Sequence, residues 1–125
     1  MAKILVVDDS EMARGQLKKV LTDAGYEVLD AGDGVQGMEV LAGNKDVNLI
    51  FCDVNMPRMD GVTMCKKVHA NADLARIPIF MLTTESNPEM KVQGKEVGVV
   101  AWITKPFVDD KLLAAVSKIL GGAAA

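Results

Sequence analysis

Strand-like and helix-like stretches alternate along this chain, and that alternation limits the folds open to it more than any other feature. Four strand-like runs are almost continuously apolar, over residues 3–7, 48–52, 79–82 and 99–103. Such runs are typical of parallel sheets buried on both faces, and parallel strands need crossover segments such as helices between them. With a shorter strand-like piece over residues 26–31, the pattern predicts an α/β fold with five parallel strands and five helices.

The helices are predicted from apolar residues at helical spacing and from signals at their ends. The spacing is clearest over residues 13–24, 35–42, 62–68 and 112–120. Asp60 is a suitable N-cap for the third helix, and Asn87 followed by Pro88 is typical of the start of a fourth. Gly94 lies inside that fourth helix, which we expect to be the least firmly held. We expect one domain over residues 1–120 and a flexible tail over residues 121–125.

The composition excludes several classes of partner. The 14 basic and 17 acidic residues nearly balance, which indicates neither nucleic-acid binding nor a membrane-surface charge. No apolar run approaches the roughly 18 residues that a membrane helix needs, so we expect a cytoplasmic protein, and a monomer. Cys52 and Cys65 lack the spacing of a zinc site and are expected to be buried thiols, and His69 is expected on a solvated helix face.

Each apolar run ends at polar residues that suit cation binding or phosphoryl chemistry. These residues are Asp8 and Asp9, then Asp53, then Thr83 and Thr84, and finally Lys105. In a parallel sheet these strand ends share one edge, which is where ligands bind. Carboxylates gathered there repel one another by about 4 kcal/mol per pair at 4 Å, for an effective dielectric constant of about 20. We therefore expect Lys105 and a hard divalent cation, for which Mg²⁺ is the best candidate, to offset the repulsion.

Taken one at a time, the same residues also suit ordinary structural roles. Asp8 and Asp9 suit a helix N-cap, and Asp53 suits a turn. Threonine is common in strands and turns, and a single loop lysine such as Lys105 is usually solvated. Their joint arrival at one edge, with complementary charges, favours a functional site over four independent structural needs.

Four segments of the chain, in this order and spacing, resemble the receiver domain of two-component response regulators. They are VVDDS at residues 6–10, DVNMPRMDG at 53–61, TTE at 83–85 and KPF at 105–107. The resemblance covers almost the whole chain, and residues 83–86 and 101–107 are most similar to the stand-alone CheY-type regulators of chemotaxis. It implies a doubly wound, flavodoxin/CheY-like sheet with the strand order 2-1-3-4-5.

The resemblance also implies a role for the acidic residues. Asp53 is the phosphoacceptor, which takes its phosphoryl group from a histidine kinase, and a carboxylate is a competent nucleophile for that step. The implied ligands of Mg²⁺ are Asp8, Asp9, Asp53 and the backbone carbonyl of Asn55. The protein is then a signalling phosphoacceptor and not an enzyme, although it assists its own phosphotransfer and autodephosphorylation.

Further roles follow from the resemblance for residues near the other strand ends. Lys105 and the hydroxyl of Thr83 bind phosphoryl oxygens, although residue chemistry alone leaves Thr84 open. Thr83 and the aromatic Trp102 form a conformational switch, while a fixed packing role for Trp102 is the alternative. The remaining implications are that Asn55 and Glu85 tune a short-lived phosphoryl state, and that the Lys105–Pro106 peptide bond is cis.

The implied partners are a histidine kinase of the chemotaxis type, the flagellar motor switch protein as the target of a changed surface of the fourth helix, fifth strand and fifth helix, and a phosphatase. Alternatives within the family are a single-domain receiver of a phosphorelay or cell-cycle pathway, and an unphosphorylated binding module. A haloacid-dehalogenase-type phosphatase is disfavoured, because it needs a general acid where Asn55 stands. A flavodoxin-like electron carrier is disfavoured because Asp8 and Asp9 would repel the phosphate of a flavin.

Overall fold

The predicted alternation of strands and helices is present in the computed structural model, which describes residues 2–54, 56, 58–84 and 88–121. Within those residues the strands are β1 (Lys3–Val7), β2 (Glu27–Ala31), β3 (Leu49–Asp53), β4 (Ile79–Thr83) and β5 (Val99–Thr104). The helices are α1 (Glu11–Asp23), α2 (Gly34–Gly43), α3 (Gly61–Ala70), α4 (Pro88–Glu96) and α5 (Asp109–Ile119). Residues 122–125 of the expected tail lie outside the described residues, so the division into domain and tail stays a prediction.

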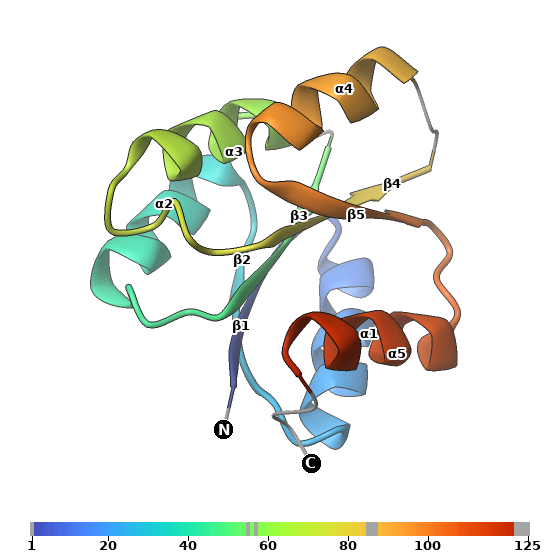
Figure 1. Ribbon diagram of the computed structural model, residues 1–125. Helices are drawn as coiled ribbons and strands as arrows, with labels where there is room; N and C mark the ends of the chain where they lie inside the picture. Colours follow the sequence, from blue (N-terminus) through green and yellow to red (C-terminus); the bar gives the residue numbers. More distant parts are fainter. Residues whose placement is uncertain (1, 55, 57, 85–87, 122–125) are drawn as a thin grey trace.

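The strands form one parallel sheet in the order β2-β1-β3-β4-β5, as the resemblance implied. Helices α1 and α5 lie on one side of the sheet, and α2, α3 and α4 lie on the other (Figure 1). The order reverses beside β1, so the crevice at the carboxyl ends of β1 and β3 is where ligands bind in open sheets of this kind. The fold class predicted from the sequence is confirmed.

Two apolar layers hold the sheet between the helices. On the α1 and α5 side, the layer includes Leu17 and Val116 against Val6 and Phe51. The layer on the other side contains both cysteines, which are buried as expected. Contact with Cys65 and burial raise the pKa of the Cys52 thiol far above its usual value. Because the central strands are buried on both faces, their carboxyl ends have little freedom to move relative to one another.

The starts of the helices are fixed by side-chain caps. The hydroxyl of Ser10 accepts from the N–H of Ala13 at 3.2 Å, so α1 is capped by Ser10. The structural alternative that Asp8 and Asp9 serve as its N-cap is therefore wrong. Asp60 caps α3 as predicted, with its carboxylate accepting from the N–H of Thr63 at 2.8 Å.

Helix α4 packs closely on β5 through a residue without a side chain. A Cβ atom at Gly94 would lie 2.7 Å from Cζ2 of Trp102 and 3.1 Å from Cβ of Val99. The indole of Trp102 is partly buried against the same apolar layer as the cysteines. Gly94 is thus needed for the approach of helix and indole, which is a reason for this glycine that the sequence did not reveal.

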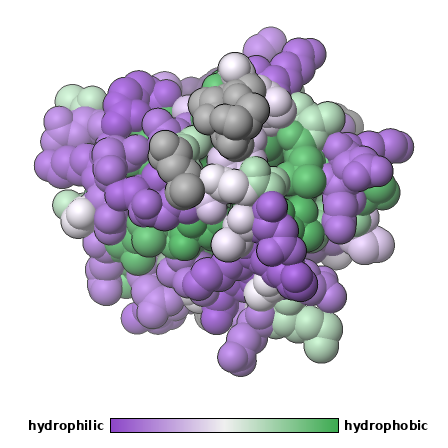
Figure 2. Space-filling model, turned by 90° about the horizontal axis from the view of Figure 1, so that it is seen from below, coloured by the Kyte–Doolittle hydropathy of each residue, from purple (hydrophilic) through white to green (hydrophobic). Residues whose placement is uncertain are grey.

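The outer surface is mainly polar on the face shown in Figure 2, where hydrophobic side chains occupy smaller areas between hydrophilic ones. His69 is exposed on α3, as expected. Among the described residues, no helix is long and apolar enough to cross a membrane.

Candidate functional site

The structure brings Asp8, Asp9 and Asp53 together at the carboxyl edge of the sheet. Asp8 and Asp9 directly follow β1, and Asp53 is the last residue of β3. One carboxylate oxygen of each lies within 4.8 Å of the others. Asp8 and Asp53 are 1% and 8% exposed, whereas Asp9 lies at the surface. The cluster is therefore open to solvent on the side of Asp9 and closed by the sheet below.

Lys105 supplies positive charge to this cluster from the loop after β5. Its Nζ atom lies 2.7 Å from Oδ2 of Asp8 and 3.4 Å from Oδ2 of Asp53. Its backbone N–H donates to the carbonyl oxygen of Thr83 at 2.8 Å, which ties the loop to β4. The Lys105–Pro106 peptide bond is cis, the geometry that the resemblance implied.

The protonation behaviour of Asp53 and Lys105 follows from their surroundings. Burial, and then the charge of Asp8, raises the pKa of Asp53 from 3.8 to about 6, although Lys105 opposes the shift. Partial burial disfavours the charged form of Lys105, but its contacts with Asp8 and Asp53 outweigh this and its pKa is raised. Lys105 therefore does not offset the combined effect of burial and the charge of Asp8 on Asp53.

The oxygen donors of the cluster fit a hard divalent cation. Magnesium prefers carboxylate and carbonyl oxygens and binds through few carboxylates while it keeps several waters. A dication between the three aspartates would offset the charge of Asp8, which is the second cause, after burial, of the raised pKa of Asp53. Asn55, whose backbone carbonyl is the other implied ligand, lies outside the described residues, as does Glu85.

Thr83 and Thr84 have different environments at the end of β4. Thr83 ends the strand, directly after Leu82, which pairs in register with Asp53. Thr83 is 4% exposed, whereas Thr84 is exposed and lines a groove beside the cluster. The buried threonine is the one that the resemblance selects.

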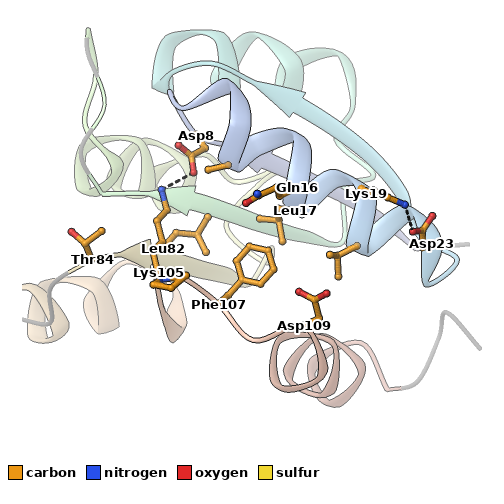
Figure 3. A pocket seen from close by; sticks show the side chains of 13 residues that line it. Asp8, Gln16, Leu17, Lys19, Asp23, Leu82, Thr84, Lys105, Phe107 and Asp109 are labelled. Carbon is orange, nitrogen blue, oxygen red and sulfur yellow. Dashed lines mark hydrogen bonds and ion pairs between the residues drawn. The ribbon is translucent and has the colours of Figure 1, made fainter.

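A groove of about 760 Å³ runs from the cluster along α1 (Figure 3). Asp8, Thr84 and Lys105 line one end, Leu17 and Phe107 lie further along, and the ion pair of Lys19 with Asp23 lies at the far end. A partly apolar groove between α1 and the loop that leads to α5 therefore adjoins the site at Asp8 and Lys105.

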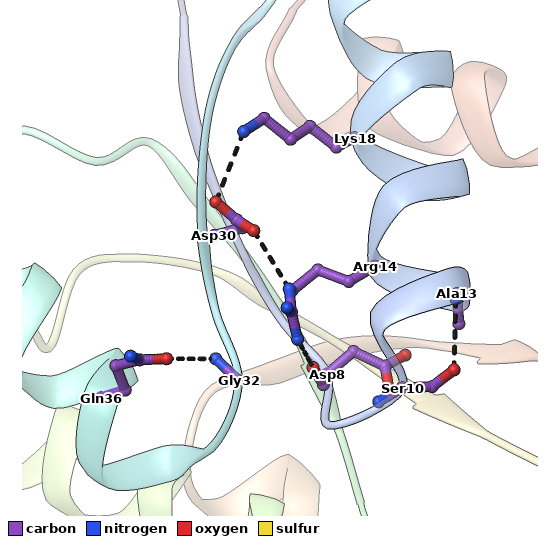
Figure 4. A network of polar contacts seen from close by, with 8 residues as sticks. All are labelled: Asp8, Ser10, Ala13, Arg14, Lys18, Asp30, Gly32 and Gln36. Atoms are coloured by element: carbon purple, nitrogen blue, oxygen red, sulfur yellow. Dashed lines mark hydrogen bonds and ion pairs between the residues drawn. The ribbon is translucent and has the colours of Figure 1, made fainter.

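Arg14 is a neighbour of the site that reasoning from the sequence missed. Its guanidinium group donates to the backbone oxygen of Asp8 and to the carboxylate of Asp30 on β2 (Figure 4). The sequence places Arg14 one turn into the helix that follows Asp8 and Asp9, close to the site. Because a charged residue on such a helix is usually solvated, this position did not indicate a contact with the site.

The matching family model and similar known proteins point to the same family. Residues 4–117 match the response regulator receiver domain family. The chain is 39% identical over 120 residues to chemotaxis protein CheY1 of Helicobacter pylori, covering 95% of this chain and 97% of that protein. It is 38% identical to a chemotaxis protein CheY homolog of Campylobacter jejuni, covering 95% and 92%.

The fold comparison agrees with the sequence comparison. The solved structure of Vibrio cholerae chemotaxis protein CheY4 superposes with a TM-score of 0.90 at 41% identity, covering 95% of this chain and 98% of that one. The match in sequence extends over nearly the whole chain and includes every strand that forms the acidic edge. The chain belongs to the response regulator receiver domain family.

Proposed function

We propose that this protein is a phosphorylation-activated switch in which Asp53 accepts a phosphoryl group from a histidine kinase with Mg²⁺ present. The observation that carries the proposal is the clustering of three carboxylates within 4.8 Å, with the ammonium of Lys105 on two of them. We propose residues 1–120 as the receiver domain. Asp8, Asp9 and Asp53, with the carbonyl of Asn55, are the proposed ligands of the cation.

The proposed reaction is an in-line transfer. A carboxylate oxygen of Asp53 forms a bond to phosphorus while the bond from phosphorus to the imidazole nitrogen of the donor breaks, and the nitrogen keeps the electron pair. Mg²⁺ held by Asp8, Asp9, Asp53 and the carbonyl of Asn55 would supply positive charge to the phosphoryl oxygens. Lys105, which already contacts Asp53 at 3.4 Å, binds a phosphoryl oxygen, and the hydroxyl of Thr83 donates to another.

The proposed output is a change in packing next to the site. Movement of Thr83 toward the phosphoryl group alters the space beside β4 and β5. Phosphorylation thereby shifts the population between two pre-existing conformations of the protein. Thr83 pairs in register with Thr104, two residues after Trp102, which packs against α4. We propose that the indole of Trp102 responds and that the surface formed by α4, β5 and α5 changes.

The proposed partners follow from the relatives. Both curated relatives described above are chemotaxis proteins by name, so we propose a chemotaxis-type histidine kinase upstream and the flagellar motor switch protein downstream. A phosphatase is a further proposed partner. Asn55 and Glu85 are proposed to tune the lifetime of the phosphoryl group by acting on the attacking water.

The test is to measure binding of a motor-switch peptide to the protein before and after treatment with acetyl phosphate and Mg²⁺. We expect binding to strengthen at least several-fold after phosphorylation, and Asp53→Asn to remove the increase. Asp46→Asn, which changes an exposed carboxylate that pairs with Lys3, is the control and should keep the increase. Equal affinity of the two forms of the wild-type protein for the peptide would contradict the proposed target.

A further inference from the structure

Arg14 joins three parts of the fold through one guanidinium group. Its Nη1 atom donates to the backbone oxygen of Asp8 at 2.7 Å, and its Nε atom donates to Oδ2 of Asp30 at 3.0 Å. Figure 4 shows this side chain reaching from α1 to the end of β1 and to β2. Since the side chain of Arg14 is only 20% exposed, both contacts are partly shielded from water.

The oxygen that accepts from Arg14 belongs to the peptide unit between Asp8 and Asp9. A peptide unit is planar, so a hydrogen bond to its oxygen restricts the orientation of both residues that it joins. The N–H of Asp8 donates to the carbonyl oxygen of Ala31 at 3.1 Å, next to Asp30. Asp8 is therefore anchored to the end of β2 on one side by its own N–H and on the other through Arg14.

Two hydrogen bonds, one to each oxygen, orient the carboxylate of Asp8. Its Oδ1 atom accepts from the N–H of Ser10 at 2.9 Å, and its Oδ2 atom accepts from Nζ of Lys105 at 2.7 Å. Asp9, by contrast, lies at the surface, where packing restrains a side chain less. The backbone before Asp9 is thus the firm part of the site, and Arg14 is what holds its carbonyl.

We propose that Arg14 is a positioning residue for the cation site, which acts by fixing the Asp8–Asp9 peptide with Asp30 as its anchor. The inference rests on the proposed function, because it assigns Arg14 a role toward the cation that Asp8 and Asp9 hold. The role is one of positioning, because the guanidinium group of Arg14 contacts the Asp8 backbone and the Asp30 carboxylate. Groups that orient metal ligands typically change metal affinity by 10- to 100-fold when they are removed.

Charge alone predicts the opposite effect, which makes the proposal testable by its sign. Removing a cationic side chain near three carboxylates makes the site more negative and should tighten the binding of a dication. Loss of positioning should weaken that binding. Lys18 offers a matched control, because its Nζ atom lies 3.4 Å from Oδ1 of the same Asp30 while it does not bridge to Asp8.

The experiment titrates Mg²⁺ into ¹⁵N-labelled protein and follows amide shifts for wild type, Arg14→Met, Lys18→Met and Arg14→Lys. We expect Arg14→Met to bind Mg²⁺ about tenfold more weakly or worse, while Lys18→Met binds as tightly as wild type or slightly more tightly. Arg14→Lys keeps the charge but lacks the planar fork that reaches two acceptors, so it should be as weak as Arg14→Met.

A second readout needs no cation. With EDTA present, exchange of the Ser10 amide should be faster in Arg14→Met than in Lys18→Met, because the Asp8 carboxylate that accepts from this amide is less firmly placed. If Arg14→Met does not fold, Arg14→Lys carries the test, because it keeps the positive charge and any loss of Mg²⁺ affinity then reports the lost contacts to Asp8 and Asp30.

The possible failures are distinct. Tighter or unchanged Mg²⁺ binding in a folded Arg14→Met protein, or wild-type affinity in Arg14→Lys, would overturn the positioning role while leaving the proposed function intact. No Mg²⁺ binding by the wild-type protein would instead overturn the proposed function itself.

Discussion

Asp53 is the residue in which structure and chemistry are most closely linked. Burial and the nearby charge of Asp8 raise its pKa to about 6, so its ionised form is disfavoured in the folded protein. In the proposed reaction, the same burial leaves the Asp53 carboxylate with less of the water that would shield it as a nucleophile. A buried carboxylate with a raised pKa lowers the stability of the folded protein at neutral pH.

This raised pKa predicts a pH-dependent effect of removing the carboxylate. An acid with a raised pKa in the folded state destabilises the fold above that pKa, and the effect disappears once pH falls below its unfolded value of 3.8. With EDTA present, Asp53→Asn should therefore be more stable than wild type by about 3 kcal/mol at pH 8, the free energy that corresponds to a pKa rise from 3.8 to about 6. The gain should shrink as pH falls through 6 and be nearly absent at pH 4.

Urea unfolding at several pH values measures this difference, and Asp46→Asn is a control of opposite sign. Its hydrogen bond with Lys3 lowers the pKa of Asp46, so replacing it should slightly destabilise the protein at neutral pH. A stability gain for Asp53→Asn that is the same at pH 4 and pH 8 would show that ionisation of Asp53 is not its cause.

At the scale of elements, the contact between α4 and β5 depends on the absence of a side chain at residue 94. A methyl group there would lie 2.7 Å from the Trp102 indole, which is closer than carbon atoms approach without displacement. The helix that was expected to be weakened by its glycine therefore gains its position on the sheet from that same glycine. This links the geometry of α4 to the aromatic residue proposed to respond to phosphorylation.

A pair of identical substitutions tests that contact. Gly94→Ala should destabilise the protein by about 1–3 kcal/mol through overpacking, and the emission of the single tryptophan should shift as the indole moves. Gly15→Ala in α1 is the control, because a Cβ atom there meets nothing within 4 Å. That change should stabilise the protein by roughly 0.5–1 kcal/mol through helix propensity. Equal stabilisation by both changes, with unaltered emission, would refute the packing argument.

At the scale of the whole molecule, the sequence predicted what depends on local pattern. Apolar runs located the strands to within about a residue, because central parallel strands are buried on both faces. The strand ends then indicated that Asp8, Asp9 and Asp53 meet, as they do in the structure. The strand order came from family resemblance, since alternation alone does not fix it.

What the sequence did not predict depends on contacts between distant segments. Arg14 looks like a solvated helix residue until β2 places Asp30 next to it. Gly94 looks like a defect until the indole of Trp102 lies against it. Both depend on the distance between two elements, which no local pattern encodes.

The most direct test of the account asks whether Asp53 itself carries the phosphoryl group. The protein is treated with acetyl phosphate and Mg²⁺, followed by intact mass over time, then reduced with borohydride and digested so that the modified residue is located by peptide mass. We predict one phosphoryl group per chain, dependent on Mg²⁺, short-lived, and found on residue 53, with Asp53→Asn unmodified. An unmodified wild-type chain in the presence of Mg²⁺, or a phosphoryl group on another residue, would contradict the account.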